Sequence, residues 1–316
     1  MMRLTYDPEL VEDVVLLSER VAPRAEARTF RRERDRIYEI ADPDQREASF
    51  RSLHLQWFGR LALHDIVEEL VNERVDIVDR MNEGRVLRAL TRSEEGADLI
   101  DRVVQDGADV QPLLVIRLRP AILLEPEALR ALLRHELTHV GDMLDPAFGY
   151  ERALPPSDVG PSGDNILRDR YRVLWDVTID GRLARASHDR CSVRLPFGGP
   201  QGRQPDRAGH ADATRTARWQ EFTATFPMLG DRSGAAFDDW FDRIRPTHAA
   251  LAAFAQAPNG AGSTNPADSG RCPLCRFPVA SLDRQPGRLS ADAVSAIRRD
   301  YSIWSIEQGL CSQCLD

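Results

Sequence analysis

The chain has 316 residues, a formal net charge of −8 at pH 7 and 42% hydrophobic residues. This length suffices for one large domain or two modest ones, and the composition is ordinary for a folded globular protein. The acidic balance argues against broad nucleic-acid binding, although it leaves a local basic patch open. No apolar run approaches the roughly 18–20 residues of a membrane helix, and the first residues lack the pattern of a secretory signal. We therefore expect a cytoplasmic protein without a membrane partner.

The first part of the chain shows mostly helical patterns. Apolar side chains recur at helical spacing in residues 7–23 and 50–81. We therefore expect residues 1–84 to form a helical N-terminal region. The segment RVLRALT at 85–91 predicts a short strand, and SEEGADLIDRVVQDG at 93–107 predicts a helix followed by a turn.

A strand and a long helix are expected next. The residues from Leu113 to Leu118 form an apolar run that is typical of a buried strand. Pro126 stands between two glutamates, and a proline at the first helical position with acids in the first turn is typical of a helix start. Apolar residues then recur at helical spacing until Pro146, so we expect a helix with one buried face.

The rest of the chain predicts further helices and a small terminal module. Helices are expected over 166–186, 215–226 and 234–256, and the aperiodic segment 187–214 is expected to be a surface excursion. Residues 258–270 have the composition of a flexible linker. The predicted domains are the N-terminal region (1–84), a central catalytic domain (85–257), the linker (258–270) and a C-terminal module (271–316).

Five residues of the long helix form the motif HExxH. His135 and His139 are four residues apart, so on a helix both imidazoles lie on one face and can bind one ion. Zinc binds imidazole nitrogen and accepts a tetrahedral site with one position open for water. Glu136 lies beside the first ligand and can act as the general base that takes a proton from the attacking water. The motif therefore predicts a catalytic zinc site.

At these residues the chain resembles the zincin metallopeptidases, over residues 85–186. In that superfamily a strand lies along the substrate and the HExxH helix lies beneath the cleft. The resemblance implies hydrolysis of peptide bonds in a protein or peptide substrate. The fold expected for the chain is α+β and mostly helical, with a zincin-like metallopeptidase domain, a helical N-terminal region and a small C-terminal zinc-binding module.

A catalytic zinc needs a third protein ligand. On the helix expected over 166–186, Asp176 and Asp180 fall on the apolar face, where aspartates are rare unless they pair or bind metal. Their spacing resembles the ExxxD pattern of the gluzincins, with Asp in place of the ligand Glu. The resemblance implies that Asp176 binds zinc and that Asp180 orients a ligand histidine. Salt bridges to Arg170, Arg182 or other arginines are the alternative.

Asp145 is the second candidate for the third ligand. HELTHVGDMLD overlays the HExxHxxGxxH/D pattern of the metzincins, with Asp145 at its last position. That pattern needs glycine at position 142, where the chain turns, and here the glycine is Gly141. Both candidates therefore stay open, with Asp176 favoured.

Other polar residues are weaker candidates. Asp142 lies one turn beyond His139 and is a candidate for the shell around the ligands. An oxyanion needs a donor such as Tyr, His or Arg, for which Tyr150, Tyr171 and His188 are candidates. The remaining histidines, His54, His64, His210 and His248, are expected to be surface or packing residues.

Four of the five cysteines form two CxxC pairs, Cys272 with Cys275 and Cys311 with Cys314. In a reducing compartment this arrangement is typical of a structural zinc held by four thiolates. A helical pattern at 290–304 lies between the pairs. Cys191 has no pair in the sequence and is expected to be a free thiol. The cofactors predicted for the chain are thus two Zn²⁺ ions, one catalytic and one structural.

The combination of HExxH with a C-terminal zinc ribbon is similar in architecture to the SprT-like proteases, which act on DNA-associated proteins. Those proteases use a third histidine soon after HExxH, and this chain has none between His139 and His188. The ribbon is therefore expected to bind a protein or a nucleic acid, or only to stabilise the end of the chain. We expect a zinc metallopeptidase; the alternative is a catalytically degenerate zincin that acts as a regulator by binding protein or nucleic acid through its ribbon.

Overall fold

The computed structural model describes residues 2–21, 23–103, 110–156, 161–192, 207–259, 272–275, 282–283, 289–301, 304–306 and 309–315. The chain divides into two compact units. Unit 1 comprises Met1–Arg152, Asp176–Thr214 and Phe241–His248, and unit 2 comprises Ala153–Trp175, Arg215–Trp240 and Ala249–Asp316. Most of the predicted linker and the middle of the predicted surface excursion lie outside the described residues, as do the side chains of His188, Cys191 and His210.

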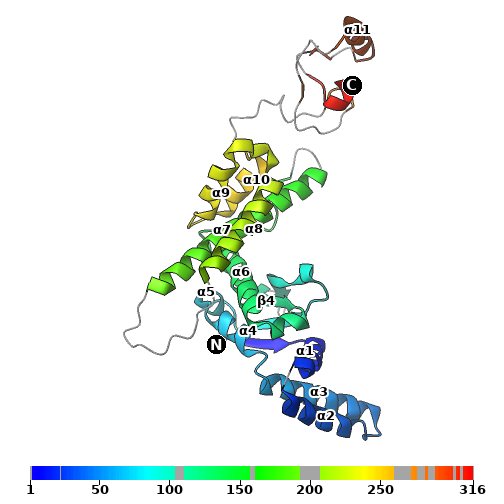
Figure 1. The fold of residues 1–316 in the computed structure, drawn as a ribbon, viewed down its shortest axis with the longest axis vertical. Coiled ribbons are helices and arrows are strands. Elements are labelled where there is room, and N and C mark those ends of the chain that lie inside the picture. The colour runs from blue at the N-terminus through cyan, green and yellow to red at the C-terminus, as the bar shows by residue number, and fades with distance from the viewer. Residues whose placement is uncertain are drawn as a thin grey trace. The chain divides into compact units, whose positions relative to one another are not determined.

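The structure is mostly helical with one small sheet, so the expected α+β class is confirmed (Figure 1). The N-terminal elements are β1 (Arg3–Tyr6), α1 (Pro8–Val21), α2 (Arg24–Ile37), α3 (Pro43–Arg60), α4 (Asp65–Asn72) and α5 (Val75–Val78). The next are β2 (Glu83–Arg88), η1 (Arg92–Glu94), β3 (Gly96–Val103), β4 (Val110–Leu118), η2 (Pro120–Leu124), α6 (Pro126–Leu144) and α7 (Pro161–Ser192). The last are α8 (Arg207–Thr225), η3 (Pro227–Arg232), α9 (Ser233–Phe241), α10 (His248–Gln256), α11 (Ala291–Asp300) and α12 (Ser312–Leu315).

Unit 1 contains a four-stranded sheet in the order β1-β2-β4-β3. β1 and β2 pair in parallel, as do β2 and β4, whereas β3 pairs antiparallel to β4 at the edge. The strands expected over 113–118 and in 85–91 are confirmed as β4 and β2. The central strand β4 is buried on both faces, since Leu114, Val115 and Ile116 are at most 2% exposed.

The helix predicted within 93–107 is wrong, because Gly96–Val103 forms strand β3. Leu99 and Val103 are four residues apart, a spacing that also suits a helix. Pairing with β4, from Gly96 opposite Arg117 to Val103 opposite Val110, supplies the backbone hydrogen bonds of the strand. This partner is not visible in the local sequence, and strand preference depends on such context.

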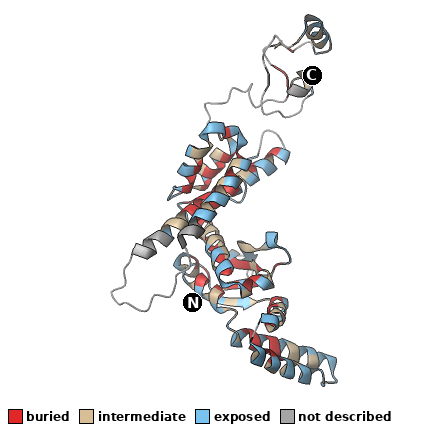
Figure 2. Cartoon of the chain, viewed as in Figure 1, coloured by how far each residue is buried: buried red, intermediate tan, exposed pale blue. Residues whose placement is uncertain are grey.

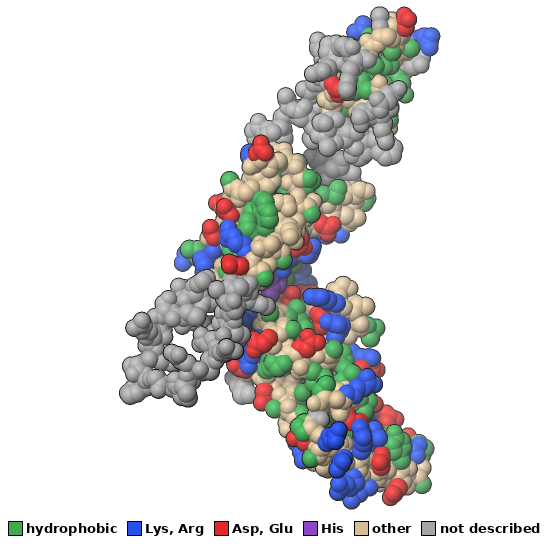
Figure 3. All heavy atoms as spheres, in the orientation of Figure 1, with side chains coloured by type: hydrophobic (Ala, Val, Ile, Leu, Met, Phe, Trp, Pro, Cys, Tyr) green, Lys and Arg blue, Asp and Glu red, His purple; other side chains and the backbone are tan. Residues whose placement is uncertain are grey.

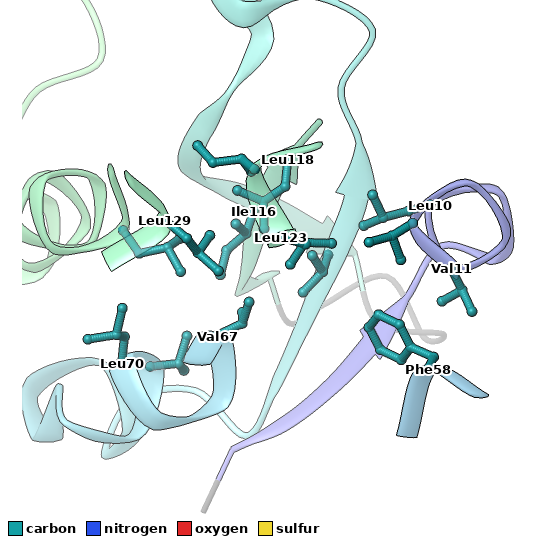
Figure 4. Close-up of a cluster of buried hydrophobic side chains, with 14 of the residues drawn as sticks. Leu10, Val11, Phe58, Val67, Leu70, Ile116, Leu118, Leu123 and Leu129 are labelled. Atoms are coloured by element: carbon teal, nitrogen blue, oxygen red, sulfur yellow. The ribbon is translucent and has the colours of Figure 1, made fainter. Parts of the chain in front are cut away.

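The core of unit 1 lies between the sheet and helices α1, α3, α4 and α6. Figure 4 shows side chains from these elements meeting β4 and η2. α6 contributes Leu129, Leu133, Leu137 and Val140, each at most 1% exposed, which confirms the predicted buried face. Pro126 begins α6 and Leu144 ends it, as expected. One side of the HExxH helix is thus fixed against the sheet, and the other side carries the residues of the motif that are not buried in this core.

Unit 2 contains a helical part with an aromatic interior and the cysteine module. Phe222 and Phe226 are fully buried, with ring centroids 4.7 Å apart, and Phe237 packs edge-on against Phe222. In the cysteine module, Ser290 caps α11 by accepting a hydrogen bond from the backbone N–H of Ala293 at 3.2 Å. Among the described residues, no helix has the length and apolar character needed to cross a membrane.

Candidate metal centres

Helix α6 presents His135 and His139 on the side opposite its buried leucines. Leu133 and Leu137 are each two residues before a histidine, which corresponds to about half a turn of an α-helix. The two imidazoles are one turn apart, with ring centroids separated by 5.0 Å. Both histidines are partly buried, with side chains 13% exposed. The packing of α6 on the sheet therefore directs both rings to one place within unit 1.

Helix α7 supplies two carboxylates to the same place. Oδ1 of Asp176 lies 3.3 Å from Nε2 of His135 and 3.0 Å from Nε2 of His139. One ligand atom from each of these three residues lies within 4.8 Å of the others, so the group can hold a metal ion. Asp176 and Asp180 are buried, at 6% and 8% exposed, as their place on the apolar face of the predicted helix suggests.

Asp180 contacts the other nitrogen of His135. Its Oδ1 lies 2.7 Å from Nδ1 of the imidazole. An ionised carboxylate only accepts hydrogen bonds, so the imidazole donates through Nδ1. A neutral His135 then carries its lone pair on Nε2, the atom that faces Asp176. This contact is the one by which a buried carboxylate orients a metal-binding imidazole.

The charges in the group are strongly coupled. Burial alone would lower the pKa of His135, but hydrogen bonds to Asp176 and Asp180 outweigh it and raise the pKa to about 9. Burial alone would raise the pKa of Asp176, but hydrogen bonds to His135 and His139 hold it well below the usual range of a carboxyl group. Without a metal, the group is an ion-paired cluster in which a proton takes the place of a cation.

The donor set suits a small divalent cation. Two imidazole nitrogens and one carboxylate oxygen, with a fourth position left for water, form a usual catalytic zinc set. Ligand bonds of about 2.0–2.1 Å place neighbouring donors of a tetrahedral site about 3.3 Å apart. The two observed separations from Asp176 Oδ1, 3.0 and 3.3 Å, are close to this value.

Glu136 points toward the edge strand of the sheet. Its Oε2 accepts a hydrogen bond from the backbone N–H of Ala97 in β3 at 3.2 Å. A Cβ at Gly96 would lie 3.0 Å from the same oxygen, so a larger residue there would crowd the carboxylate. The sequence did not predict this close approach at Gly96, because residues 93–107 have the pattern of a helix and a turn. The glycine is the only local signal that another group approaches the backbone closely at this point.

Asp142 and Asp145 do not join the group of His135, His139 and Asp176. The carboxylate of Asp142 forms a two-pronged ion pair with Arg182 of α7, with distances of 2.7 and 2.5 Å. Oδ1 of Asp145 accepts a hydrogen bond from the backbone N–H of Ala147 at 2.9 Å. Of the arginines proposed as alternative partners for Asp176 and Asp180, Arg182 therefore pairs with Asp142. This ion pair joins α6 and α7, the two helices that carry the candidate ligands.

A polar cavity of about 310 Å³ lies beside the C-terminal half of α6, where Thr138 and Gly141 form part of its lining. The side chain of Arg74 lies against α6 in this cavity. It donates a hydrogen bond to Thr138 Oγ1 at 3.0 Å and forms an ion pair with Asp76. A Cβ on Gly141 would lie 1.9 Å from the Arg74 guanidinium. Gly141 therefore makes room for this arginine and lies within α6, rather than at a sharp turn of the metzincin kind.

The candidate oxyanion donors have different surroundings. Tyr150 packs edge-on against His248, with ring centroids 5.9 Å apart, in unit 1. Tyr171 belongs to unit 2, where it is buried against Trp175. The side chain of His188 lies outside the described residues. The packing roles expected for the other histidines fit three of them: His54 packs against Phe30 and Phe50, His64 against Phe58, and His248 against Phe148.

The four cysteines of the terminal module form a second group that could hold a metal ion. One sulfur from each of Cys272, Cys275, Cys311 and Cys314 lies within 4.8 Å of the others, and Cys275 and Cys311 are 3.8 Å apart. Zinc–sulfur bonds of about 2.3 Å give sulfur separations of about 3.8 Å in a tetrahedral site. The cluster therefore fits a four-thiolate metal site.

The module is built around this cluster. Cys272 and Cys311 are buried beside Trp304 and Leu310, and an antiparallel bridge joins Asp283 to Leu310. Burial raises the pKa of the Cys272 thiol, but backbone N–H groups, that of Cys311 first among them, outweigh it and lower the pKa to about 6. Hydrogen bonds of this kind favour the thiolate, which is the form that binds metal.

No family model matches this chain, and neither a curated protein nor a solved structure matches it.

Proposed function

We propose that the protein is a zinc-dependent metallopeptidase of the zincin type, with His135, His139 and Asp176 as the zinc ligands. The observation that carries the proposal is the meeting of two imidazole Nε2 atoms and one carboxylate oxygen at the helix that also carries Glu136. The HExxH spacing alone provides only two ligands, and α7 adds the third. Asp176 is preferred to Asp145 because the carboxylate of Asp145 hydrogen-bonds the backbone of Ala147 instead.

Bound zinc would polarise the scissile carbonyl group and lower the pKa of the attacking water. In this proposal Glu136 accepts the proton that the water loses and delivers it to the leaving amine nitrogen. Asp180 holds the His135 ring through Nδ1, so that Nε2 faces the metal. Since α6 is fixed by its buried leucines, the backbone that carries His135, Glu136 and His139 is held in place before the reaction.

The edge strand β3 offers a way to hold a peptide. The N–H of Ala97 donates to Glu136 and the N–H of Leu99 donates to the Asp98 carboxylate at 2.7 Å, so neither amide pairs with β4. Both amides therefore face the free edge of the sheet, in line with the alternation of an antiparallel strand. An extended substrate can add to such an edge through backbone hydrogen bonds. Its carbonyl groups would then pass near Glu136, because Glu136 contacts this strand.

The test is the variant Glu136→Gln, measured with an unfolded, fluorescein-labelled casein as the probe. Loss of a general base typically costs about 10²–10⁴ in rate, so we expect hydrolysis to fall by that factor while zinc content stays the same. Glu127→Gln is the matched control, since Glu127 is an exposed glutamate in the first turn of the same helix.

Equal casein hydrolysis by Glu136→Gln and the wild type would refute the proposed role of Glu136. Absence of hydrolysis in the wild type, with zinc bound at His135 and His139, would instead favour the catalytically degenerate regulator. The four-cysteine cluster gives that alternative its support, because it forms a second metal-binding group in the chain.

A further inference from the structure

Helix α2 has an unusually basic composition for this acidic chain. Its fourteen residues, RAEARTFRRERDRI, contain six arginines and three acids. Arg24, Arg28, Arg32 and Arg36 are all exposed, and each is four residues after the last. Residues four apart lie on one face of a helix and about 6 Å apart along its axis, so the four form a row about 18 Å long. We call this row the α2 arginine row.

The opposite side of α2 packs against the rest of unit 1. Ala27 and Phe30 are buried, and the Phe30 ring packs edge-on against Trp57 of α3 at 5.4 Å. Oε2 of Glu33 accepts a hydrogen bond from Nε1 of Trp57 at 2.7 Å, so this acid is directed inward. Figure 2 shows the resulting division, with buried residues along one side of α2 and α3 and exposed residues on the other. The packing therefore fixes the arginine row on the outward side.

The acids of α2 do not neutralise the row. Asp35 is the one acidic residue of α2 on the outward face, and it pairs with Arg34, which lies outside the row, at 3.4 Å. Arg31, at the margin of that face, pairs with Glu19 of α1. Within the described residues, none of the four arginines of the row has an ion-pair partner. Figure 3 shows arginine side chains gathered over the end of unit 1 that carries α2 and α3.

A row of this kind is unfavourable for the isolated helix. Like charges four residues apart repel one another and destabilise a helix, and the row contains three such pairs. Neither packing nor an internal ion pair offsets this repulsion. A regularly spaced polyanion outside the chain would do so.

We propose that the α2 arginine row binds the phosphate backbone of duplex DNA without reading its base sequence. The row spans a length comparable to about five base-pair steps of 3.4 Å, so it can face several phosphates at once. Arginine forms paired hydrogen bonds with phosphate oxygens. Between the ends of the helix the outward face carries only Arg, Asp35, Ala25 and Thr29. The nearest exposed aromatic residue, Tyr38, follows the helix and packs edge-on against Phe50 of α3, so the row itself has no aromatic side chain on which unstacked bases could lie. A duplex, which presents phosphates and keeps its bases stacked, therefore fits it better than a single strand.

The test uses the full chain and a short fluorescently labelled DNA duplex, with anisotropy measured over a range of salt concentrations. If four phosphates are contacted, the logarithm of the association constant falls with the logarithm of salt concentration with a slope of about −3.6. The variant with all four arginines of the row changed to Gln should lose most of this slope and bind far more weakly. Changing the same four to Lys should retain binding, because the charge remains. The proposal does not depend on peptidase activity.

A matched control removes the same charge elsewhere. Arg85, Arg92, Arg168 and Arg245 are exposed and lie outside α2, so their joint change to Gln alters net charge equally. Duplex binding should survive in this control, and thermal unfolding should show that both variants are folded. Equal loss in both variants, unchanged binding after removal of the row, or binding to anionic vesicles but not to the duplex would each overturn the proposal.

Discussion

The carboxylate of Asp180 lies 2.7 Å from Nδ1 of His135, on the side of the imidazole away from Asp176. His135 is thus held between two aspartates of one helix, with one at each ring nitrogen. Asp176 and Asp180 are four residues apart, about one turn of α7. This spacing lets the two carboxylates reach the two nitrogens of the same imidazole. A metal ion can replace the proton between His135 and Asp176 without disturbing the contact with Asp180.

The first prediction concerns Asp180→Asn. The amide keeps the size of the side chain but is a weaker acceptor for Nδ1–H. The imidazole of His135 should therefore be held less firmly, and its Nε2 should be a weaker base. Loss of such an outer partner typically costs about 10–100-fold in metal affinity. We expect the zinc affinity of the His135 site to fall by that factor in competition with a chelating dye. Unchanged affinity would show that Asp180 does not orient the ligand.

The second prediction concerns pH. The pKa of His135 is raised from 6.5 to about 9, so its ion pair stabilises the metal-free fold fully below pH 6.5 and is lost as pH rises through about 9. The contribution of this pKa shift to the free energy of unfolding is about 3 kcal/mol. We expect the melting temperature of metal-free protein to fall between these pH values. In Asp180→Asn the fall should be smaller and should end at lower pH, because one of the two carboxylates that raise the pKa of His135 in the folded protein is gone; identical profiles would contradict this account.

The helices were more predictable than the strands at the edges of the sheet. α6 could be predicted from Pro126, the spacing of its leucines and Pro146, because all these signals lie within one segment. β1 and β3 escaped prediction because their pairing partners are distant or ambiguous in the sequence: Arg3 pairs opposite Glu83, and Gly96 opposite Arg117. Residues 3–6 also fall within a segment whose neighbours are strongly helical.

The aspartates of the candidate site were predictable, because a charged side chain on the buried face of a helix needs a partner. Two aspartates on the apolar face of a predicted helix needed a partner, and the structure provides the histidines of α6. The contact between Glu136 and Ala97 was not predictable, since it requires β3 to be a strand. The pairing of Asp142 with Arg182 was not predictable either, because several arginines were available and only the relative placement of α6 and α7 selects one.

The third prediction tests the approach of β3 to Glu136, the proposed general base. In Gly96→Val, the added Cβ lies 3.0 Å from Glu136 Oε2 and the further methyl groups displace the carboxylate. A misplacement of about 1 Å can cost about 100-fold in rate. We expect casein hydrolysis to fall by up to this factor while zinc content is unchanged. Gly230→Val is the control, because Gly230 also has a positive φ, 52° against 158° at Gly96, and nothing lies within 4 Å of a Cβ there; equal losses in both variants would indicate that backbone strain, and not crowding of Glu136, lowers the rate.

The fourth prediction concerns the ion pair between Asp142 and Arg182. Their side chains are 10% and 22% exposed, so removing one charge leaves the other largely buried. The cost should approach the roughly 3 kcal/mol typical of a broken buried pair. We expect Arg182→Gln to lower the free energy of unfolding by about this amount and to weaken zinc binding at His135, since α6 and α7 lose a connection. The double variant Asp142→Asn/Arg182→Gln should recover part of the stability, and a double variant as unstable as the sum of its parts would argue against direct coupling.

The last prediction separates the two metal-binding groups. Cys311→Ser removes one of four thiolates from a module whose buried residues surround the metal position. Small metal-bound modules draw much of their folding free energy from the metal. We therefore expect the zinc content to fall from two ions per chain, one for each group, to one. Trp304, which is 5% exposed beside the cysteines, should become accessible to a fluorescence quencher. The change should be absent from a Trp304→Phe background, and casein hydrolysis should persist because the ligands at His135, His139 and Asp176 are untouched. Loss of both zinc ions in Cys311→Ser would mean that the catalytic group depends on the cysteine module.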